Sequence, residues 1–285
     1  MNLIRLGRWN RLTVTRRVDF GVYLDGGDPG EVLMPLKYVP RGTQPGDELE
    51  VFVYLDQQER LVATTETPKA QVGEFAYLKV AWVNRYGAFL DWGLLKDLFV
   101  PFHEQKMRME QGRSYIVYPY IDGETARIVA SAKVEHFLSS EMPPYKHGDE
   151  VNLLVWQKTD LGFKVIVENQ YSGQLYSNEI FTSLHTGDRL KAFVKHVRED
   201  GKIDLVLQHP GVKGLDNFSN QLLQQIEDAG GFIPFTDKSS AEDIEETFGV
   251  SKKTFKRAVG MLYRQRLIEL LPNGISLVRK DEGAS

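Results

Sequence analysis

Short runs of alternating apolar and polar residues fill most of the chain, and glycine, proline, aspartate and asparagine separate them. Runs of about four to eight residues that are rich in β-branched and aromatic side chains are typical of half-buried β-strands. In the first part of the chain such runs lie at residues 12–15, 20–24, 32–35, 49–55 and 61–64. Five short strands within about 65 residues are typical of a small Greek-key barrel of the OB type.

The same order of strands is predicted twice more. The second set lies at residues 76–83, 88–91, 98–100, 115–120 and 126–130, and the third at residues 151–157, 163–168, 173–176, 190–197 and 203–207. Pro143-Pro144 indicates a linker before the third set, and Pro210-Gly211 closes it. The pattern therefore predicts three tandem five-stranded OB-fold barrels.

Glycine spacing supports this repeat. Gly7, Gly73 and Gly148 each precede a second glycine by 14 residues (Gly21, Gly87, Gly162), and a third glycine follows 25 residues later (Gly46, Gly112, Gly187). Self-similarity of this kind marks repeated structural units. We expect the second glycine of each unit to let its strand bend or bulge.

The period of the apolar residues lengthens to that of a helix after Leu215, and the helix is predicted to end near Gly230-Gly231. Ser240 and Ser251 are N-cap candidates for two further helices, and Pro272-Asn273-Gly274 predicts a hairpin turn. Two helices, a turn, a third helix and a hairpin form the layout of a winged helix.

The predicted chain is mainly β, with a small α+β winged-helix domain at its C-terminus. The predicted domains are residues 1–66, 67–142, 143–210 and 211–285, with a frayed tail at 280–285. No stretch approaches the length of a membrane span, and the first 15 residues lack the apolar core of a signal peptide. We therefore expect a cytoplasmic protein that does not contact a membrane.

Composition narrows the chemistry. The chain has no cysteine, which excludes disulfides, thiolate zinc sites and a cysteine nucleophile. Its net charge of −4 argues against a protein that coats nucleic acid through bulk charge. Any affinity for nucleic acid has to come from local cations and from stacking.

Aromatic residues flank the second glycine in the first two units. Phe20 and Tyr23 surround Gly21, and Tyr86 and Phe89 surround Gly87. If the strand bends at the glycine, rings three residues apart share a face and form a platform for unstacked bases. The alternative is that these rings belong to the barrel core.

Cations lie near both pairs of rings. They are Arg16, Arg17 and Lys37 in the first unit and Lys79, Arg85, His103 and Lys106 in the second. These side chains can pair with phosphates, and guanidinium groups can also stack on bases. Residues 1–18 also hold five arginines and no acid, and the alternative for this segment is a solvated strand edge that discourages sheet pairing.

Residues 73–91, followed by Phe99-Val100-Pro101-Phe102-His103-Glu104, resemble the RNA-binding domain named after ribosomal protein S-one. That domain is an OB-fold variant with an aromatic-Gly-Ala-Phe signature and a following strand that ends near a histidine. The resemblance implies RNA-facing positions at Lys79, Tyr86, Phe89 and His103, and at Phe20 and Tyr23 in the first unit.

The third unit departs from this pattern. Leu161 and Lys164 stand where the domain has aromatic residues, and Tyr171 and Tyr176 are the candidates to replace them. The whole layout is similar to the conserved virulence factor B family of bacterial RNA-binding proteins, and residues 171–181 resemble that family too.

The predicted third helix offers a second surface. Six cations and no acid occur between residues 252 and 266, and Lys252, Lys253, Lys256 and Arg257 lie at the N-terminal end. That end of a recognition helix meets base edges or phosphates. Salt bridges to the acidic residues 242–246 of the preceding helix are the alternative.

No enzyme motif stands out. The six histidines lack the helical spacing of zinc ligands, and neither a phosphate-binding glycine loop nor a Gly-X-Ser-X-Gly elbow occurs. We predict a non-catalytic protein without metal or cofactor that binds single-stranded RNA. A duplex-DNA-binding regulator that uses the winged helix, and a protein-docking adaptor on the ribosome or a polymerase, are the alternatives.

Overall fold

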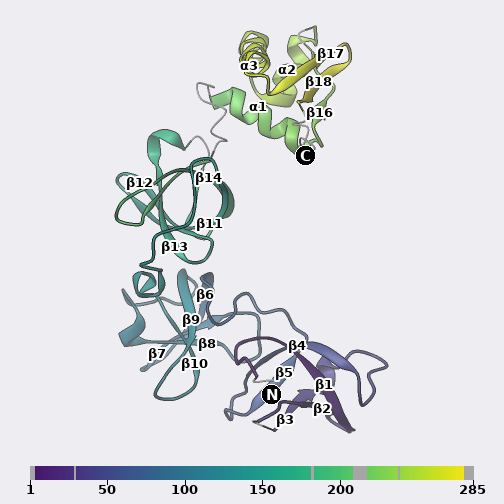
Figure 1. Ribbon diagram of the computed structural model, residues 1–285, viewed down its shortest axis with the longest axis vertical. Helices are drawn as coiled ribbons and strands as arrows, with labels where there is room; N and C mark the ends of the chain where they lie inside the picture. The colour runs from purple at the N-terminus through teal and green to yellow at the C-terminus, as the bar shows by residue number, and fades with distance from the viewer. Residues whose placement is uncertain (1–3, 29, 181–182, 208–216, 237, 279–285) are drawn as a thin grey trace. The chain divides into compact units, whose positions relative to one another are not determined.

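The computed structural model describes residues 4–28, 30–180, 183–207, 217–236 and 238–278. Within them lie three closed barrels of five strands each, followed by helices and a small sheet (Figure 1). The predicted fold class, tandem barrels and a winged helix, is confirmed. Leu215, the Pro210-Gly211 segment and the tail 280–285 lie outside the described residues.

Antiparallel pairs join most neighbouring strands of each barrel. In the first two barrels one parallel pair completes the closed sheet. The first consists of β1 (Arg8–Val18), β2 (Gly21–Asp25), β3 (Glu31–Pro35), β4 (Glu48–Leu55) and β5 (Leu61–Thr64), in the order β1-β2-β3-β5-β4. Strands β3 and β5 close it in parallel. This is the connectivity expected of an OB-type barrel.

The second and third barrels repeat the first. The second consists of β6 (Ala76–Val83), β7 (Gly87–Asp91), β8 (Leu98–Pro101), β9 (Ser114–Ile121) and β10 (Ile128–Ser131). The third consists of β11 (Glu150–Thr159), β12 (Gly162–Val167), β13 (Tyr171–Tyr176), β14 (Arg189–Val197) and β15 (Ile203–Val206). The first two barrels belong to one compact unit and share an apolar cluster in which Phe52 contacts Trp92.

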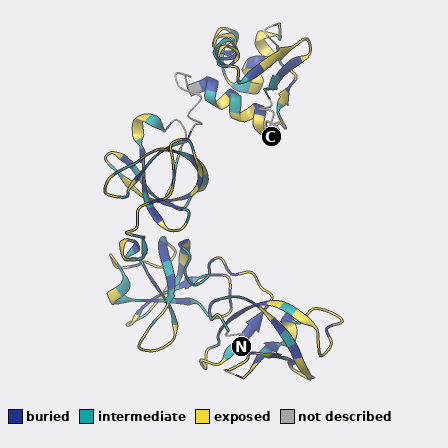
Figure 2. Cartoon of the chain, in the orientation of Figure 1, coloured by how far each residue is buried: buried dark blue, intermediate teal, exposed yellow. Residues whose placement is uncertain are grey.

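Buried and exposed residues alternate along the strands (Figure 2). In β2, Val22 and Leu24 point into the core; in β7, Ala88 and Leu90 do so. The residues between them, Tyr23 and Phe89, are only half-buried. Period-two burial therefore leaves these two rings on the outer face of their barrels.

A β-bulge interrupts the first strand of each barrel. The register shifts between Val14 and Arg16 in β1, between Val80 and Trp82 in β6, and between Val155 and Gln157 in β11. The backbone N–H of the third glycine of each unit donates to the carbonyl before the shift: Gly46 to Val14 at 2.8 Å, Gly112 to Val80 at 2.9 Å and Gly187 to Val155 at 2.8 Å. At Gly112 the φ angle is +82°, a conformation that glycine adopts without a Cβ penalty.

The prediction that the strand bends at the second glycine is wrong about the location of the bend. Gly21 and Gly87 begin β2 and β7, and the bulge lies in the preceding strand. The second glycine is needed for close approach: a Cβ on Gly87 would lie 2.3 Å from the carbonyl oxygen of Val100. The neighbouring strand leaves room only for a hydrogen.

The winged helix follows the predicted order. It contains α1 (Asn217–Asp228), β16 (Phe232–Ile233), α2 (Ala241–Phe248), α3 (Lys252–Arg264), β17 (Ile268–Leu271) and β18 (Gly274–Leu277). Both predicted caps are confirmed, since Ser240 Oγ accepts from the Asp243 N–H at 2.9 Å and Ser251 Oγ from the Thr254 N–H at 3.3 Å. Strand β16 was not predicted, because two residues carry no periodic signal.

Among the described residues, no helix is long and apolar enough to cross a membrane.

The close approach at Gly87 predicts a stability effect. Gly87→Ala should lower the free energy of unfolding by about 1–3 kcal/mol, because the methyl group forces β7 away from β8. Gly123→Ala is the matched control in the same barrel, since a Cβ there meets no atom within 4 Å. Thermal and urea unfolding of both variants would check this, and equal midpoints would contradict it.

Candidate nucleic-acid interface

The bulge in β6 places the indole of Trp82 directly opposite Phe89 of β7. Their ring centroids are 3.7 Å apart and their planes differ by 4°. Phe99 of β8 lies next to Phe89 in register, with centroids 4.8 Å apart and planes 34° apart. We call Trp82, Phe89 and Phe99 the aromatic stack.

Trp82 is held at the surface. Its side chain is 42% exposed, and its Nε1–H donates to Asp97 Oδ2 at 2.7 Å. Trp82 is not among the predicted site residues, because strict alternation after the buried Leu78 and Val80 puts residue 82 in the core. The bulge reverses the direction of its side chain, and an aromatic residue just before the glycine-containing turn is the one signal that was available.

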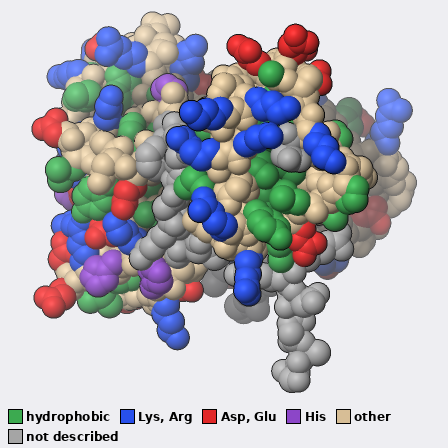
Figure 3. All heavy atoms as spheres, turned by 90° about the horizontal axis from the view of Figure 1, so that it is seen from above, with side chains coloured by type: hydrophobic (Ala, Val, Ile, Leu, Met, Phe, Trp, Pro, Cys, Tyr) green, Lys and Arg blue, Asp and Glu red, His purple; other side chains and the backbone are tan. Residues whose placement is uncertain are grey.

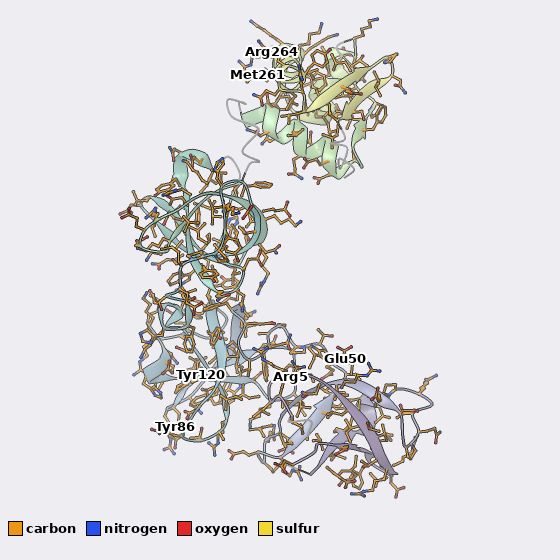
Figure 4. All side chains as sticks on the ribbon, viewed as in Figure 1. Arg5, Glu50, Tyr86, Tyr120, Met261 and Arg264 are labelled. Atoms are coloured by element: carbon orange, nitrogen blue, oxygen red, sulfur yellow. The ribbon has the colours of Figure 1, made fainter. Side chains whose placement is uncertain are left out.

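Tyr86 precedes β7 in the same turn. It is 58% exposed, and the Arg85 guanidinium lies 4.8 Å from its ring centroid. The Asn84 side-chain oxygen accepts from the Tyr86 N–H at 2.8 Å and so fixes this turn. Figure 4 shows Tyr86 at the outer edge of the second barrel. The rings of Tyr86 and Phe89 are thus outside the core, as the platform requires.

The other cations predicted for this barrel lie apart from the stack. Lys79 is exposed on β6, opposite Asp91. His103 is exposed, with its Nε2 3.6 Å from Glu104 Oε1. Lys106 pairs with Glu135 at 2.6 Å. No ring contact or hydrogen bond between these side chains and the aromatic stack is found among the described residues.

A cavity of about 590 Å³ borders the stack. The second barrel contributes Tyr86, Phe89, Trp92, Lys96, Asp97, Leu98, Phe99, Pro101, Arg127, Ile128 and Val129 to its lining, and the first contributes Leu55, Gln57 and Glu59. Phe89 and Phe99 belong to both features. Stack and cavity therefore form one continuous surface.

The first barrel carries a different arrangement at the equivalent positions. Arg16 lies opposite Tyr23, with its guanidinium carbon 3.8 Å from the ring centroid. Phe20 is 57% exposed and meets Tyr23 edge-on, with centroids 6.4 Å apart. Lys37 lies over Tyr38 instead, with Nζ 4.2 Å from that ring. The predicted pair of rings is therefore in contact here, and Arg16 covers one face of Tyr23.

Arg16 also binds Glu31. Its Nη2 lies 2.6 Å from Glu31 Oε2, and its Nε donates to both carboxylate oxygens at 3.1 Å. This hydrogen bonding raises the pKa of Arg16 and lowers the pKa of Glu31. A phosphate that approaches Arg16 has to compete with this carboxylate.

The third barrel lacks an exposed ring pair at these positions. Gln157 lies opposite Lys164, whose Nζ is 5.4 Å from the centroid of the buried Trp156. Tyr171 is only 6% exposed, so the expectation that it replaces a stacking ring is wrong. Its place in period with the buried Leu175 turns it inward. Tyr176 is half-buried, and its hydroxyl binds Arg198 and lies 3.4 Å from Asp204.

Helix α3 presents cations to solvent. Lys253, Lys256 and Arg257 are exposed and Lys252 is half-buried. Within the described residues, no ion pair joins Lys252, Lys253 or Lys256 to the acids of α2, so the salt-bridge alternative does not apply to these three lysines.

A second cavity, of about 620 Å³, lies farther along the winged helix. Its lining includes Tyr263, Arg264, Arg266, Leu270 and Leu271. On the face shown in Figure 3, Lys and Arg side chains surround a group of hydrophobic ones. Figure 4 labels Met261 and Arg264 on α3.

No cluster of three or more His, Asp or Glu side chains that could hold a metal ion occurs in the described part of the chain. Asp200 and Asp204, which flank a hairpin turn, pair with Lys202 and Arg198. These carboxylates therefore have cationic side chains as their partners.

Two domain families match parts of the chain. Residues 6–66 match the S1 domain, and residues 220–277 match the CvfB-like winged helix domain. The S1 match covers the first barrel, and the second covers most of the described winged helix. Domains of these two kinds support nucleic-acid binding.

Several proteins are similar to this chain over most of its length. The uncharacterized protein YitL of Bacillus subtilis is 28% identical over 92% of this chain and 90% of its own length. Conserved virulence factor B of Staphylococcus saprophyticus is 26% identical over 84% and 83%, respectively. A multidomain protein with nucleic acid binding domains from Streptococcus pneumoniae has a solved structure with 24% identity and a TM-score of 0.42, covering 96% of this chain and 98% of its own.

The resemblance inferred from the sequence is therefore confirmed: the chain carries an S1 domain and a CvfB-like winged helix domain and is similar to conserved virulence factor B over more than four fifths of its length.

Proposed function

We propose that this chain is a non-catalytic RNA-binding protein that takes up single-stranded RNA. Bases would stack on the rings of the second barrel, and Lys and Arg side chains would contact the phosphates. The S1 and winged helix domains support nucleic-acid binding in general. The preference for single-stranded RNA is the proposed part.

The exposed indole of Trp82 is the observation that carries this proposal. Phe89 covers one face of the indole at 3.7 Å, so the 42% of Trp82 that is exposed lies on the opposite face and the edge. A flat, prepositioned ring of this kind accepts any unstacked base, and each stacked base contributes about 1–3 kcal/mol. Paired bases inside a duplex do not offer such a face.

Exposed cations of the second barrel would supply the phosphate contacts. Arg85 is exposed beside Tyr86, and Lys79 is exposed on β6. Because each site is small, we infer that tandem modules bind one strand together, and the raised effective concentration then compensates for weak single contacts.

We further propose a regulatory role, for which the relatives are the support. Several of them, from Staphylococcus saprophyticus and Staphylococcus aureus, carry the name conserved virulence factor B. We infer that this chain acts on expression after transcription, with RNA as its partner and without a cofactor. The alternative role as a docking adaptor would appear as co-purification that survives nuclease treatment.

Truncating the stack should weaken RNA binding. We expect Trp82→Ala to raise the Kd for a short single-stranded RNA about tenfold, because one stacked base is lost. Changing Tyr86 and Phe89 together to Ala should raise the same Kd at least tenfold. Fluorescence anisotropy at fixed salt measures both.

Leu95→Ala is the control for this experiment. Leu95 is an exposed apolar residue of the same barrel, and it lies outside the stack and the cavity lining. Its replacement should leave the Kd unchanged. An unchanged Kd for folded Trp82→Ala would reject the stacking platform.

The cations of α3 favour duplex DNA as a second candidate ligand, since Lys253 and Lys256 are exposed at the end that recognition helices insert. We expect single-stranded RNA to displace a bound probe at lower concentration than duplex DNA of equal length and salt. The second candidate predicts the reverse order. It also predicts that Lys256→Ala abolishes duplex binding and that Lys238→Ala, an exposed lysine of the same domain outside α3, does not.

A further inference from the structure

The cavity beside the aromatic stack is built by two barrels. Leu55, Gln57 and Glu59 come from the end of β4 and the turn to β5 of the first barrel, and the remaining lining residues come from the second. Both barrels belong to one compact unit. We call this feature the composite cavity. An isolated second barrel would leave one of its walls missing.

The walls and the rim of the composite cavity differ in chemistry. Tyr86, Phe89 and Phe99 supply aromatic walls, and Leu98 adds a buried apolar floor. Lys96 and Arg127 supply cations, Glu59 and Asp97 supply carboxylates, and Gln57 supplies an amide. Mostly apolar walls with a few polar groups are typical of sites for small planar ligands, for which volumes of about 300–1,000 Å³ are usual.

The cations at the rim also hold the two barrels together. Arg127 Nη2 lies 2.5 Å from Glu59 Oε1, and Lys96 Nζ donates to the Asp56 carbonyl at 2.8 Å. Burial lowers the pKa of Lys96, because desolvation disfavours the charged ammonium group. The Arg127–Glu59 pair is about half exposed and is therefore open to competition by a ligand.

We propose that the composite cavity holds one nucleobase of the bound single strand, next to the base stacked on Trp82, with its phosphate on Arg127 in place of Glu59. This inference rests on the proposed RNA binding and adds the first-barrel turn to the site. Phe89 links the two positions, because it stacks on Trp82 and also lines the cavity.

The chemistry of the cavity favours a nucleotide over an apolar ligand. A base offers two flat faces to the rings and polar edges to Gln57, and its phosphate can pair with Arg127 once Glu59 is displaced. The first-barrel turn is rigid enough to serve as a wall. Asp56 Oδ1 accepts from the Gln58 and Arg60 N–H groups at 2.8 and 3.0 Å, and Glu59 holds a positive φ of 64°.

The absence of cysteine from the chain allows a direct test. Gln57→Cys and Gln58→Cys each introduce a single thiol in the same exposed turn, but only position 57 lines the cavity. Alkylation of each thiol is timed with and without saturating single-stranded RNA. We expect RNA to slow alkylation at position 57 several-fold and to leave position 58 unchanged.

The outcomes separate this inference from the proposed function. If RNA binds but protects neither thiol, or both equally, the composite cavity is not a base site, and stacking on Trp82 can still hold. If a free mononucleotide protects position 57 and the strand does not, the cavity serves a free nucleotide and the inference is overturned. If no RNA binds at all, the proposed function fails first.

The competition for Arg127 gives a second, independent readout. Glu59→Gln frees Arg127 and should tighten RNA binding several-fold. Glu48→Gln is the matched control, because this substitution removes the same charge from the same barrel. Glu48 forms a similarly exposed pair with Arg11 at 2.7 Å. Equal affinities of the two variants would contradict the placement of a phosphate on Arg127.

Discussion

A hydrogen bond from a glycine N–H to the carbonyl before each bulge is the constraint on which the barrels depend. It recurs as Gly46 to Val14, Gly112 to Val80 and Gly187 to Val155, at 2.8–2.9 Å each time. The bulge shifts every later side chain of that strand by one face. Without it Trp82 would point into the core, and the second barrel would have no ring at its surface opposite Phe89.

The same bulged hairpin therefore presents a different cross-strand pair in each of the three barrels. The position after the bulge and its partner are Arg16 with Tyr23, Trp82 with Phe89, and Gln157 with Lys164. Only the second pair is aromatic on both sides. The first offers a ring already covered by a guanidinium, and the third offers no ring. Stacking capacity is therefore concentrated in the second barrel, although the fold is repeated.

The sequence predicted the strands well and the site only partly, for a physical reason. Period-two alternation and glycine spacing indicate burial and turns. The predicted ends of β4, β6 and β9 therefore lie within one residue of the observed ends. A bulge changes the facing of a side chain without changing composition, so Trp82 went unnoticed. The prediction for Tyr171 was wrong for the opposite reason. Its ring was expected at the surface, but regular alternation along β13 places it in the core. The wall formed by Gln57 and Glu59 was invisible too, because packing between barrels leaves no local pattern.

The pairing of cations with acids decides which interaction dominates at this surface. Arg16 pairs with Glu31, Lys106 with Glu135 and Arg127 with Glu59, each at 2.5–2.6 Å. A phosphate gains from such a cation only the difference between itself and the carboxylate that it displaces, and exposed pairs differ little in free energy. Base stacking has no such competitor, because one face of Trp82 is open. Under the proposed RNA binding, a chain with a net charge of −4 would therefore hold unpaired bases mainly by stacking, and its cations would mainly select where the backbone runs.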